Sequence, residues 1–191
     1  MSQSTKQLTE MTLEEFWQLF PIILSEHDPA GAEYYKEENA LLEKQFGSLP
    51  VRISHIGSTA VEGLIAKPTV DILLEVKPAS SPDAVRQTAE QCGYTVMAES
   101  VAPEYRLDLC KGYTPQGFAE RVFHLHIRHP GDWDEIVFRD YLRRNPHKAE
   151  EYAELKKELQ KHFKHNRDAY TEAKGEFIRA CVKEGRRQRQ L

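Results

Sequence analysis

The sequence contains few cysteines and no pattern that would use them together. Its three cysteines, Cys92, Cys110 and Cys181, are widely separated and form no CxxC pair. An odd, dispersed set is typical of a reducing compartment and excludes a disulfide framework or a zinc knuckle. We therefore expect no covalent cross-link to support the fold.

Long apolar stretches and a cationic leader are also absent. No apolar run approaches the roughly 20 residues that a membrane helix needs. The amino-terminal stretch MSQSTKQLTEMTLEEF lacks the cationic start and apolar segment of a signal peptide. We therefore expect a cytoplasmic protein without membrane contact.

Strong basic charge and the commonest catalytic motifs are missing as well. The formal net charge is −4, which argues against nucleic acid as a partner. Neither a GxSxG nucleophile motif nor a P-loop occurs. With 191 residues, 40% of them hydrophobic and 29% charged, the chain can bury a core, and we expect one domain over residues 1–191. Composition does not indicate an oligomeric state.

The chain does contain helix signals, then strand signals, then helix signals again. Apolar periodicity and caps predict helices at 12–25, 32–46 and 82–92, and strands at 51–56, 69–76, 105–110 and 121–129. Everything from residue 132 to about 184 is expected to be helical, and 185–191 to be a frayed basic tail. We therefore predict an α+β fold, with a mixed β-sheet in a core of about 33–130, covering helices and a helical C-terminal third.

Three of the predicted strands alternate between apolar and polar residues. In TVDILLEV, YRLDLC and RVFHLHIRH, one face is apolar throughout. If the strands are neighbours, the other face gathers a set of charged and imidazole side chains: Asp71, Arg106, Asp108, His124 and His126. Such a face could bind a ligand, or could consist of solvated acids and half-exposed histidines.

A small-residue turn precedes the strand that begins near Asp71. Gly57 permits a tight turn, and Ser58 and Thr59 could cap a short helix whose free N–H groups attract a phosphate. A capping box of Thr59 with Glu62 would explain the same residues without a ligand. Lys67 could likewise be a surface lysine where a strand begins.

The spacing of these motifs resembles a known family. Ile56-Gly57-Ser58, followed after twelve residues by Asp71-Ile72, is similar to the signature of the nucleotidyltransferase fold. The longer stretch HIGSTAVEGLIAKPTVDI resembles the GrpB family, which is placed in that superfamily. The resemblance continues in FHLHIRH and FRDYLRRNP and covers roughly residues 33–182. It establishes no activity for the GrpB family itself.

The resemblance implies a nucleotide site with a divalent metal. Gly57 and Ser58 would hold the phosphates of a nucleoside triphosphate, assisted by Thr59 and Lys67. Asp71 would hold Mg²⁺ or Mn²⁺, and a small molecule would be the acceptor. Other residues match family motifs without an assigned role: His55, His124, His126, Arg139 and Asp140.

Leu73 departs from the superfamily pattern, which has a second carboxylate two residues after the first. A two-metal site uses carboxylates to hold ions roughly 3.5–4 Å apart, and Leu73 cannot bind a metal. Asp108 is the expected replacement, with His124 and His126 as further ligands or as a general base. One hypothesis is therefore a metal-dependent nucleotidyltransferase with Asp71, Asp108, His124 and His126 as catalytic residues.

Two further hypotheses remain open. The first is a nucleotide-binding module with a degenerate metal site, and the second is a His/Asp metal site for phosphoester hydrolysis.

The cation-rich stretch KKELQKHFKHNR, residues 156–167, is interpreted as the exposed side of a helix.

Overall fold

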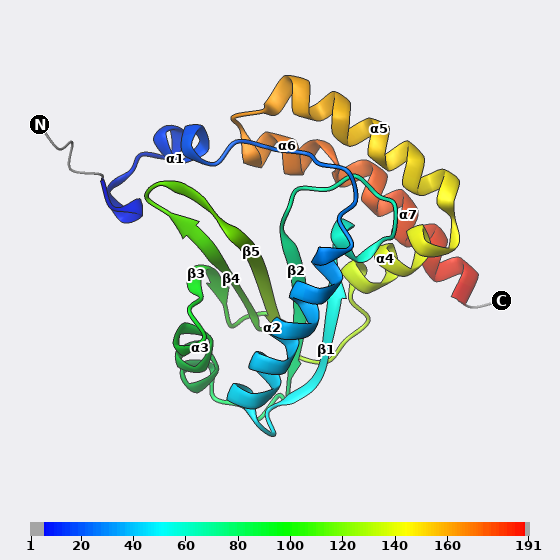
Figure 1. The fold of residues 1–191 in the computed structure, drawn as a ribbon. Helices are drawn as coiled ribbons and strands as arrows, with labels where there is room; N and C mark the ends of the chain where they lie inside the picture. Colours follow the sequence, from blue (N-terminus) through cyan, green and yellow to red (C-terminus); the bar gives the residue numbers. More distant parts are fainter. Residues whose placement is uncertain (1–5, 190–191) are drawn as a thin grey trace, which may run out of the picture.

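A mixed five-stranded sheet forms the centre of the molecule (Figure 1). The computed structural model describes residues 6–189. The strands lie in the order β1-β2-β5-β4-β3; β2 and β5 run parallel and the other neighbours antiparallel. Their bounds are β1 Pro50–Ile56, β2 Val70–Val76, β3 Thr95–Ser100, β4 Arg106–Thr114 and β5 Gly117–Arg128. The predicted α+β fold with a mixed sheet is confirmed.

Helices precede, interrupt and follow the strands. Two short 3₁₀ turns are η1 Leu8–Glu10 and η2 Ser58–Ala60. The α-helices are α1 Leu13–Leu19, α2 Ala30–Phe46, α3 Pro82–Gln91, α4 Asp134–Arg144, α5 Pro146–Phe163, α6 Arg167–Ala173 and α7 Gly175–Arg189. Within residues 6–189, no helix combines the length and apolar character that a membrane crossing requires.

The apolar face of the sheet carries the main core. Leu42 and Phe46 of α2 and Val85 of α3 pack with Ile72 of β2 and Leu125 of β5, all of them buried. Each such side chain stabilises the fold by roughly 1.5–3 kcal/mol relative to exposure. Because strands alternate, burying this face directs Asp71, Asp108, His124 and His126 to the opposite face.

The C-terminal helices form a second apolar cluster next to β1 and β2 (Figure 1). Tyr141 of α4, Tyr152 of α5 and Cys181 of α7 pack together and against Val61 and Leu64, which follow η2. The helices are therefore held by the loop between β1 and β2 and by one another.

A bulge in β4 changes the face on which Tyr113 lies. Lys111 lies over the Tyr94 ring on the apolar side, and strict alternation would put Tyr113 on that side too. The register shifts between Lys111 and Tyr113, at Gly112, whose φ is 92°. This irregularity turns Tyr113 to the polar face, where its hydroxyl lies 2.9 Å from Nε2 of His124.

Two predictions for the first half of the chain need correction. The helix predicted at 12–25 ends at Leu19, because the residue before Pro21 avoids helical backbone and Phe20 is buried against the Tyr113 ring. Strand β3 was not predicted, since it is a sheet-edge strand whose side chains are almost all exposed, leaving no alternating pattern.

The C-terminal segment also differs from its prediction. Residues 185–189 continue α7 instead of fraying, because Arg186 and Arg189 form ion pairs with Asp132. The next helix, α4, begins at Asp134 without a side-chain cap. The last two residues of the predicted tail, 190–191, lie outside the described residues.

We expect Gly112→Ala to lower the free energy of unfolding by roughly 2 kcal/mol or more. A Cβ atom at this positive φ would collide with the carbonyl oxygen of Arg121. Gly47→Ala is the control, because Gly47 also has a positive φ, 57°, but faces open space; its cost should be about 1 kcal/mol. Urea denaturation measures both, and equal costs would show that the bulge relaxes without strain.

Candidate functional site

The polar face of the sheet and the turn before η2 meet in one cavity of about 430 Å³. Gly57 and Ser58 line it from the turn, Asp71 from β2, and His124 and His126 from β5. Helices α4 to α7 supply the facing wall. The sheet and the C-terminal helices, which are distant in sequence, therefore enclose one space.

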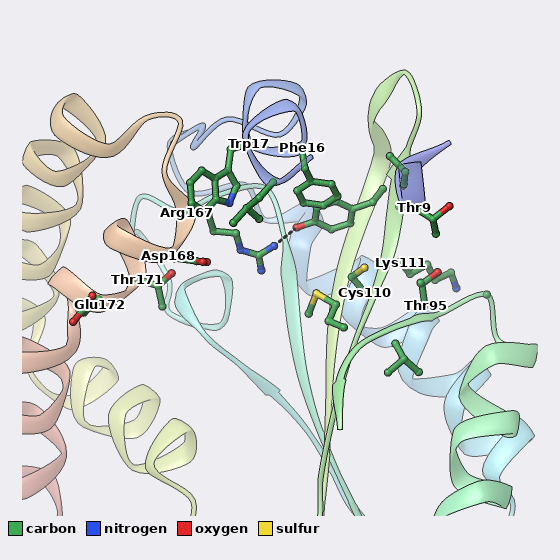
Figure 2. A pocket seen from close by; sticks show the side chains of 17 residues that line it. Thr9, Phe16, Trp17, Thr95, Cys110, Lys111, Arg167, Asp168, Thr171 and Glu172 are labelled. Carbon is green, nitrogen blue, oxygen red and sulfur yellow. Dashed lines mark hydrogen bonds between the residues drawn. The ribbon is translucent and has the colours of Figure 1, made fainter. Parts of the chain in front are cut away.

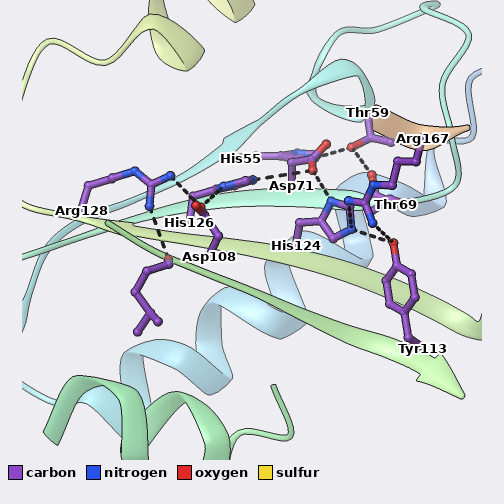
Figure 3. A network of polar contacts seen from close by, with 11 residues as sticks. His55, Thr59, Thr69, Asp71, Asp108, Tyr113, His124, His126, Arg128 and Arg167 are labelled. Carbon is purple, nitrogen blue, oxygen red and sulfur yellow. Dashed lines mark hydrogen bonds and ion pairs between the residues drawn. The ribbon is translucent and has the colours of Figure 1, made fainter. Parts of the chain in front are cut away.

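Three other predicted site residues take different positions. Lys67 lines the cavity, whereas Thr59 and Asp108 do not contribute to its wall. Thr59 lies behind the turn, where its hydroxyl donates to the carbonyl of Thr69 at 3.2 Å. Asp108 lies further along the sheet, beyond His126 (Figure 3).

The Asp71 carboxylate forms the centre of the polar network (Figure 3). Its Oδ1 lies 3.1 Å from Nδ1 of His124, the residue directly opposite in the parallel β2–β5 pair, and 4.0 Å from Nε2 of His126. Burial opposes ionisation of this carboxyl, but contact with the two imidazoles outweighs it and holds the pKa of Asp71 well below its ordinary value. Asp71 is therefore a permanent negative charge on the cavity floor.

His126 lies between two carboxylates. Its Nδ1 is 2.7 Å from Oδ1 of Asp108, and its Nε2 faces Asp71. Burial lowers the pKa of His126, but the two carboxylates overcome this and raise it to about 9. Burial would raise the pKa of Asp108, but His126 and Arg128, which donates at 2.6 Å, lower it to about 2. The two carboxylates are thus separated by an imidazolium ring.

His124 is neutral and completes a chain of hydrogen bonds to Arg167. Burial lowers the pKa of His124 despite the nearby Asp71. With Nδ1–H donating to Asp71, Nε2 accepts from the Tyr113 hydroxyl at 2.9 Å and faces the Arg167 guanidinium at 3.3 Å. Arg167 also donates to the Tyr113 oxygen at 3.2 Å.

This arrangement does not fit a two-metal site. Within residues 6–189, no group of three or more His, Cys, Asp or Glu side chains is placed to hold a metal ion. Leu73 is fully buried against Ile56 and Ile136, and the Asp108 carboxylate is engaged by His126 and Arg128. Binding of Mg²⁺ or Mn²⁺ stays a prediction for which the cavity floor offers one carboxylate, Asp71.

The turn itself supports the floor of the cavity. Gly57 has φ 69°, and a Cβ atom there would collide with the Asp71 carboxylate. η2 is only three residues long and has no side-chain cap, so the expected capping by Ser58 or Thr59 is wrong. One 3₁₀ turn aligns too few N–H groups to attract a phosphate strongly, so positive charge must come from elsewhere.

Four cationic side chains supply that charge. Lys67, Lys156, Arg167 and Lys174 all line the cavity, and none forms an ion pair with a carboxylate in the described part of the chain. Burial, reinforced by neighbouring cations, lowers the pKa of Lys156 to about 7 and those of Lys67 and Lys174 to about 8. Their mutual repulsion would be relieved by a bound anion.

Lys156 is the most buried of these four cations, with 3% of its surface exposed. Its ammonium donates to Ser58 Oγ at 3.0 Å and to the carbonyl of Ile65, and lies 4.7 Å from the centre of the Tyr152 ring. The interpretation of residues 156–167 as an exposed helix side is therefore wrong at Lys156 and at Arg167. The sequence did contain one signal, because Lys156 follows Tyr152 by one helical turn within an apolar stripe.

The rest of the wall is aromatic and apolar. Phe138, Tyr152, Tyr170 and Ile178 line it beside the cations. The Tyr170 hydroxyl is buried and has no hydrogen-bond partner among the described residues. Leaving such a group unpaired costs about 1–3 kcal/mol, so an acceptor atom on a ligand would stabilise it.

The other motif residues connect α4 to the sheet and lie outside the cavity wall. Arg139 donates to the carbonyl of His55 at 2.7 Å and pairs with Asp140 at 2.7 Å. Nε2 of His55 is 3.0 Å from the Thr59 hydroxyl, and burial lowers the pKa of His55 to about 4. These contacts join β1, the turn and α4, and so position the cavity walls.

The fold and the site together define an α+β protein with a cationic cavity on the polar face of its sheet. The family profile described as "GrpB protein" matches residues 21–184, so the chain belongs to the GrpB family. The predicted family is therefore confirmed. Membership in the nucleotidyltransferase superfamily stays a resemblance.

Relatives and one solved structure agree with this assignment. A UPF0157 protein of Pseudomonas aeruginosa is 35% identical over 79% of this chain and 62% of its own length. The UPF0157 protein YqkA of Bacillus subtilis is 35% identical over 82% of this chain and 45% of its own length. The chain thus spans less than two thirds of each. The crystal structure of the conserved protein GrpB from Enterococcus faecalis has a TM-score of 0.76 at 31% identity, covering 88% of this chain and 100% of that chain.

We expect His126→Gln to lower the free energy of unfolding by roughly 1–3 kcal/mol near pH 6. The folded-state pKa of about 9 lies above the ordinary value of 6.5. The charge of His126 therefore contributes fully below about pH 6.5, and its contribution is lost as the pH rises through about 9. The difference between variant and wild type should shrink over that range, as measured by urea denaturation.

NMR titration of the His126 ring provides the independent check of its pKa. A midpoint near the ordinary histidine value, with a stability difference that does not change with pH, would show that His126 is neutral and only packed.

Proposed function

We propose that this GrpB-family protein binds a nucleoside phosphate in the cavity between the polar face of the sheet and helices α4 to α7. The observation that carries the proposal is the set of four cations without carboxylate partners around a cavity with one inner carboxylate, Asp71. A phosphate group neutralises several such charges at once and accepts hydrogen bonds from each of them.

The positions of Lys156 and Lys67 support the proposal that the phosphate binds next to the turn at Gly57 and Ser58. Lys156 is held against Ser58, and Lys67 comes from the loop between the turn and β2. The acidic residues that α4 adds to the lining are Asp134 and Glu135, and Asp134 is already paired with Arg186 at 2.7 Å. At least one unpaired positive charge, that of Lys156, therefore lies directly beside Ser58.

The aromatic residues of the cavity wall support the proposal that the bound phosphate belongs to a nucleoside phosphate. Phe138, Tyr152 and Tyr170 offer ring surfaces, and the unpaired Tyr170 hydroxyl offers a hydrogen-bond donor. A volume of about 430 Å³ lies within the range of roughly 300–1,000 Å³ typical of small-molecule pockets. Apolar walls with few polar groups are the usual composition of such sites.

Nucleotidyl transfer to a small acceptor is the second candidate, and it rests on the resemblance of the turn and Asp71 to the nucleotidyltransferase signature. The residue that should supply the second carboxylate is the buried Leu73, and Asp108 is held away by His126. We derive no metal-dependent step from this donor set. A binding module therefore agrees better with the geometry than a transferase does.

We expect Lys156→Met to weaken binding of ATP, titrated without metal in a calorimeter, by about tenfold or more, since it removes a buried charge-assisted hydrogen bond. Lys157→Met is the matched control: it is the next residue of α5, exposed and paired with Glu154, and should change the affinity by less than about twofold. If Lys156→Met fails to fold, Lys174→Met tests the same cavity. Equal affinities in all variants would remove the cavity from the proposal.

We expect no pyrophosphate release from mixed nucleoside triphosphates by the wild type, with Mg²⁺ or Mn²⁺ and a panel of small acceptors. Metal-free ATP binding should persist in Asp71→Asn, because the lysines make the contact. Turnover in the wild type that disappears in Asp71→Asn would instead establish nucleotidyl transfer and overturn the binding-only proposal.

A further inference from the structure

A second cavity, of about 890 Å³, lies beneath α1 at the far side of Tyr113 and Arg167 (Figure 2). Its lid consists of η1 and α1, its floor of β4 with the start of β3, and its side of α6. Arg167 and Thr171 of α6 line both this cavity and the cationic cavity. The two spaces therefore share a wall but have different linings.

The lining of this second cavity is largely apolar. Leu13, Phe16 and Trp17 of α1 line it together with Met97 of β3. Leu13 and Met97 are 58% and 42% exposed. Exposed apolar side chains that converge on one concavity mark a binding site for an apolar molecule more often than solitary ones do.

Arg167 provides a positive charge in this cavity, and it forms no ion pair with a carboxylate within residues 6–189. Its side chain lies next to Trp17 (Figure 2), and its guanidinium contacts the Tyr113 hydroxyl and Nε2 of His124. The other cation of the lining, Lys111, is already bound to both carboxylate oxygens of Glu38, at 2.9 and 3.0 Å.

Two acids lie at the rim of the same cavity. Asp168 and Glu172 belong to α6 and are exposed to solvent, whereas Arg167 is half-buried. Charges that face water are screened and interact weakly with a ligand inside, while a partly buried charge interacts more strongly. The positive charge of Arg167 should therefore favour a ligand that carries a negative charge.

We propose that this cavity binds a small apolar carboxylate, with the hydrocarbon part against Leu13, Phe16 and Trp17 and the carboxylate on the Arg167 guanidinium. Guanidinium and carboxylate form paired hydrogen bonds of matching geometry. The proposal does not rest on the nucleoside phosphate of the other cavity: Arg167 lines both cavities, but Lys67, Lys156 and Lys174 line the cationic cavity alone.

The lid of this cavity is a feature outside the family match. The GrpB profile begins at residue 21, whereas η1 and α1 span residues 8–19. The cationic cavity, in contrast, is lined only by residues within 21–184. The lid of the proposed site thus lies outside the matched region, whereas its floor and Arg167 lie within it.

Fluorescence of Trp17 tests the proposal directly, because the chain has two tryptophans and Trp133→Phe leaves Trp17 alone. The probes are 4-phenylbutyrate, 4-phenylbutanol and 4-phenylbutylamine, which share one hydrocarbon part. We expect a saturable change with the carboxylate and an affinity about tenfold or more above those of the alcohol and the amine. Calorimetry on the wild type checks that Trp133→Phe has not altered binding.

A charge pair at the cavity mouth is the second arm of the test. At low ionic strength, where charges at the rim are least screened, Leu13→Glu should weaken 4-phenylbutyrate binding more than Leu13→Lys does, although both remove the same apolar side chain. Val51→Glu, at an exposed position of β1, controls for the added charge and should have no effect. Equal binding of the three probes, tighter binding of the amine, or equal effects of the two Leu13 variants would overturn the proposal.

Discussion

The contact of Asp71 with the two histidines of β5 is the interaction on which the polar face depends. Burial alone would raise the pKa of a carboxyl in this position. His124 and His126 keep it ionised because the parallel pairing of β2 with β5 places them beside it. Asp108 then stabilises the charge of His126, and Tyr113 reaches the outer nitrogen of His124 through a bulge. Each of these polar side chains is thus oriented by its contact with the next one.

The C-terminal helices place Lys156, Arg167 and Lys174 across the cavity from this network, and none of the three forms an ion pair with a carboxylate within residues 6–189. Lys156 and Lys174 are held close to Lys67 and Arg167, although burial and repulsion lower the pKa of each lysine. An arrangement that is unfavourable in the empty cavity becomes favourable when an anion is bound, so the ligand would also stabilise the fold. The positive charges of these side chains neutralise no carboxylate of the described residues, and this is the physical reason to regard the cavity as a binding site.

Leu73 explains why the same sheet face lacks a second carboxylate. Its side chain fills a small apolar cluster with Ile56 of β1 and Ile136 of α4, next to Trp133. An acid at this position would be buried without a partner and would separate α4 from the sheet. The position that could bind a metal is thus used to attach the helices that form the far wall of the cavity.

The sequence by itself determined the sheet faces, because alternation in three strands depends only on which side chains avoid water. It also determined the family, through the stretch from His55 to Ile72, and placed Gly57, Asp71, His124 and His126 near one another. The tertiary structure alone decided that Asp108 lies behind His126, that Tyr113 joins the site and that Lys156 is buried. Strand register, the irregularity of β4 at Gly112 and the angle at which helices meet a sheet depend on packing between distant segments, and no local pattern records them.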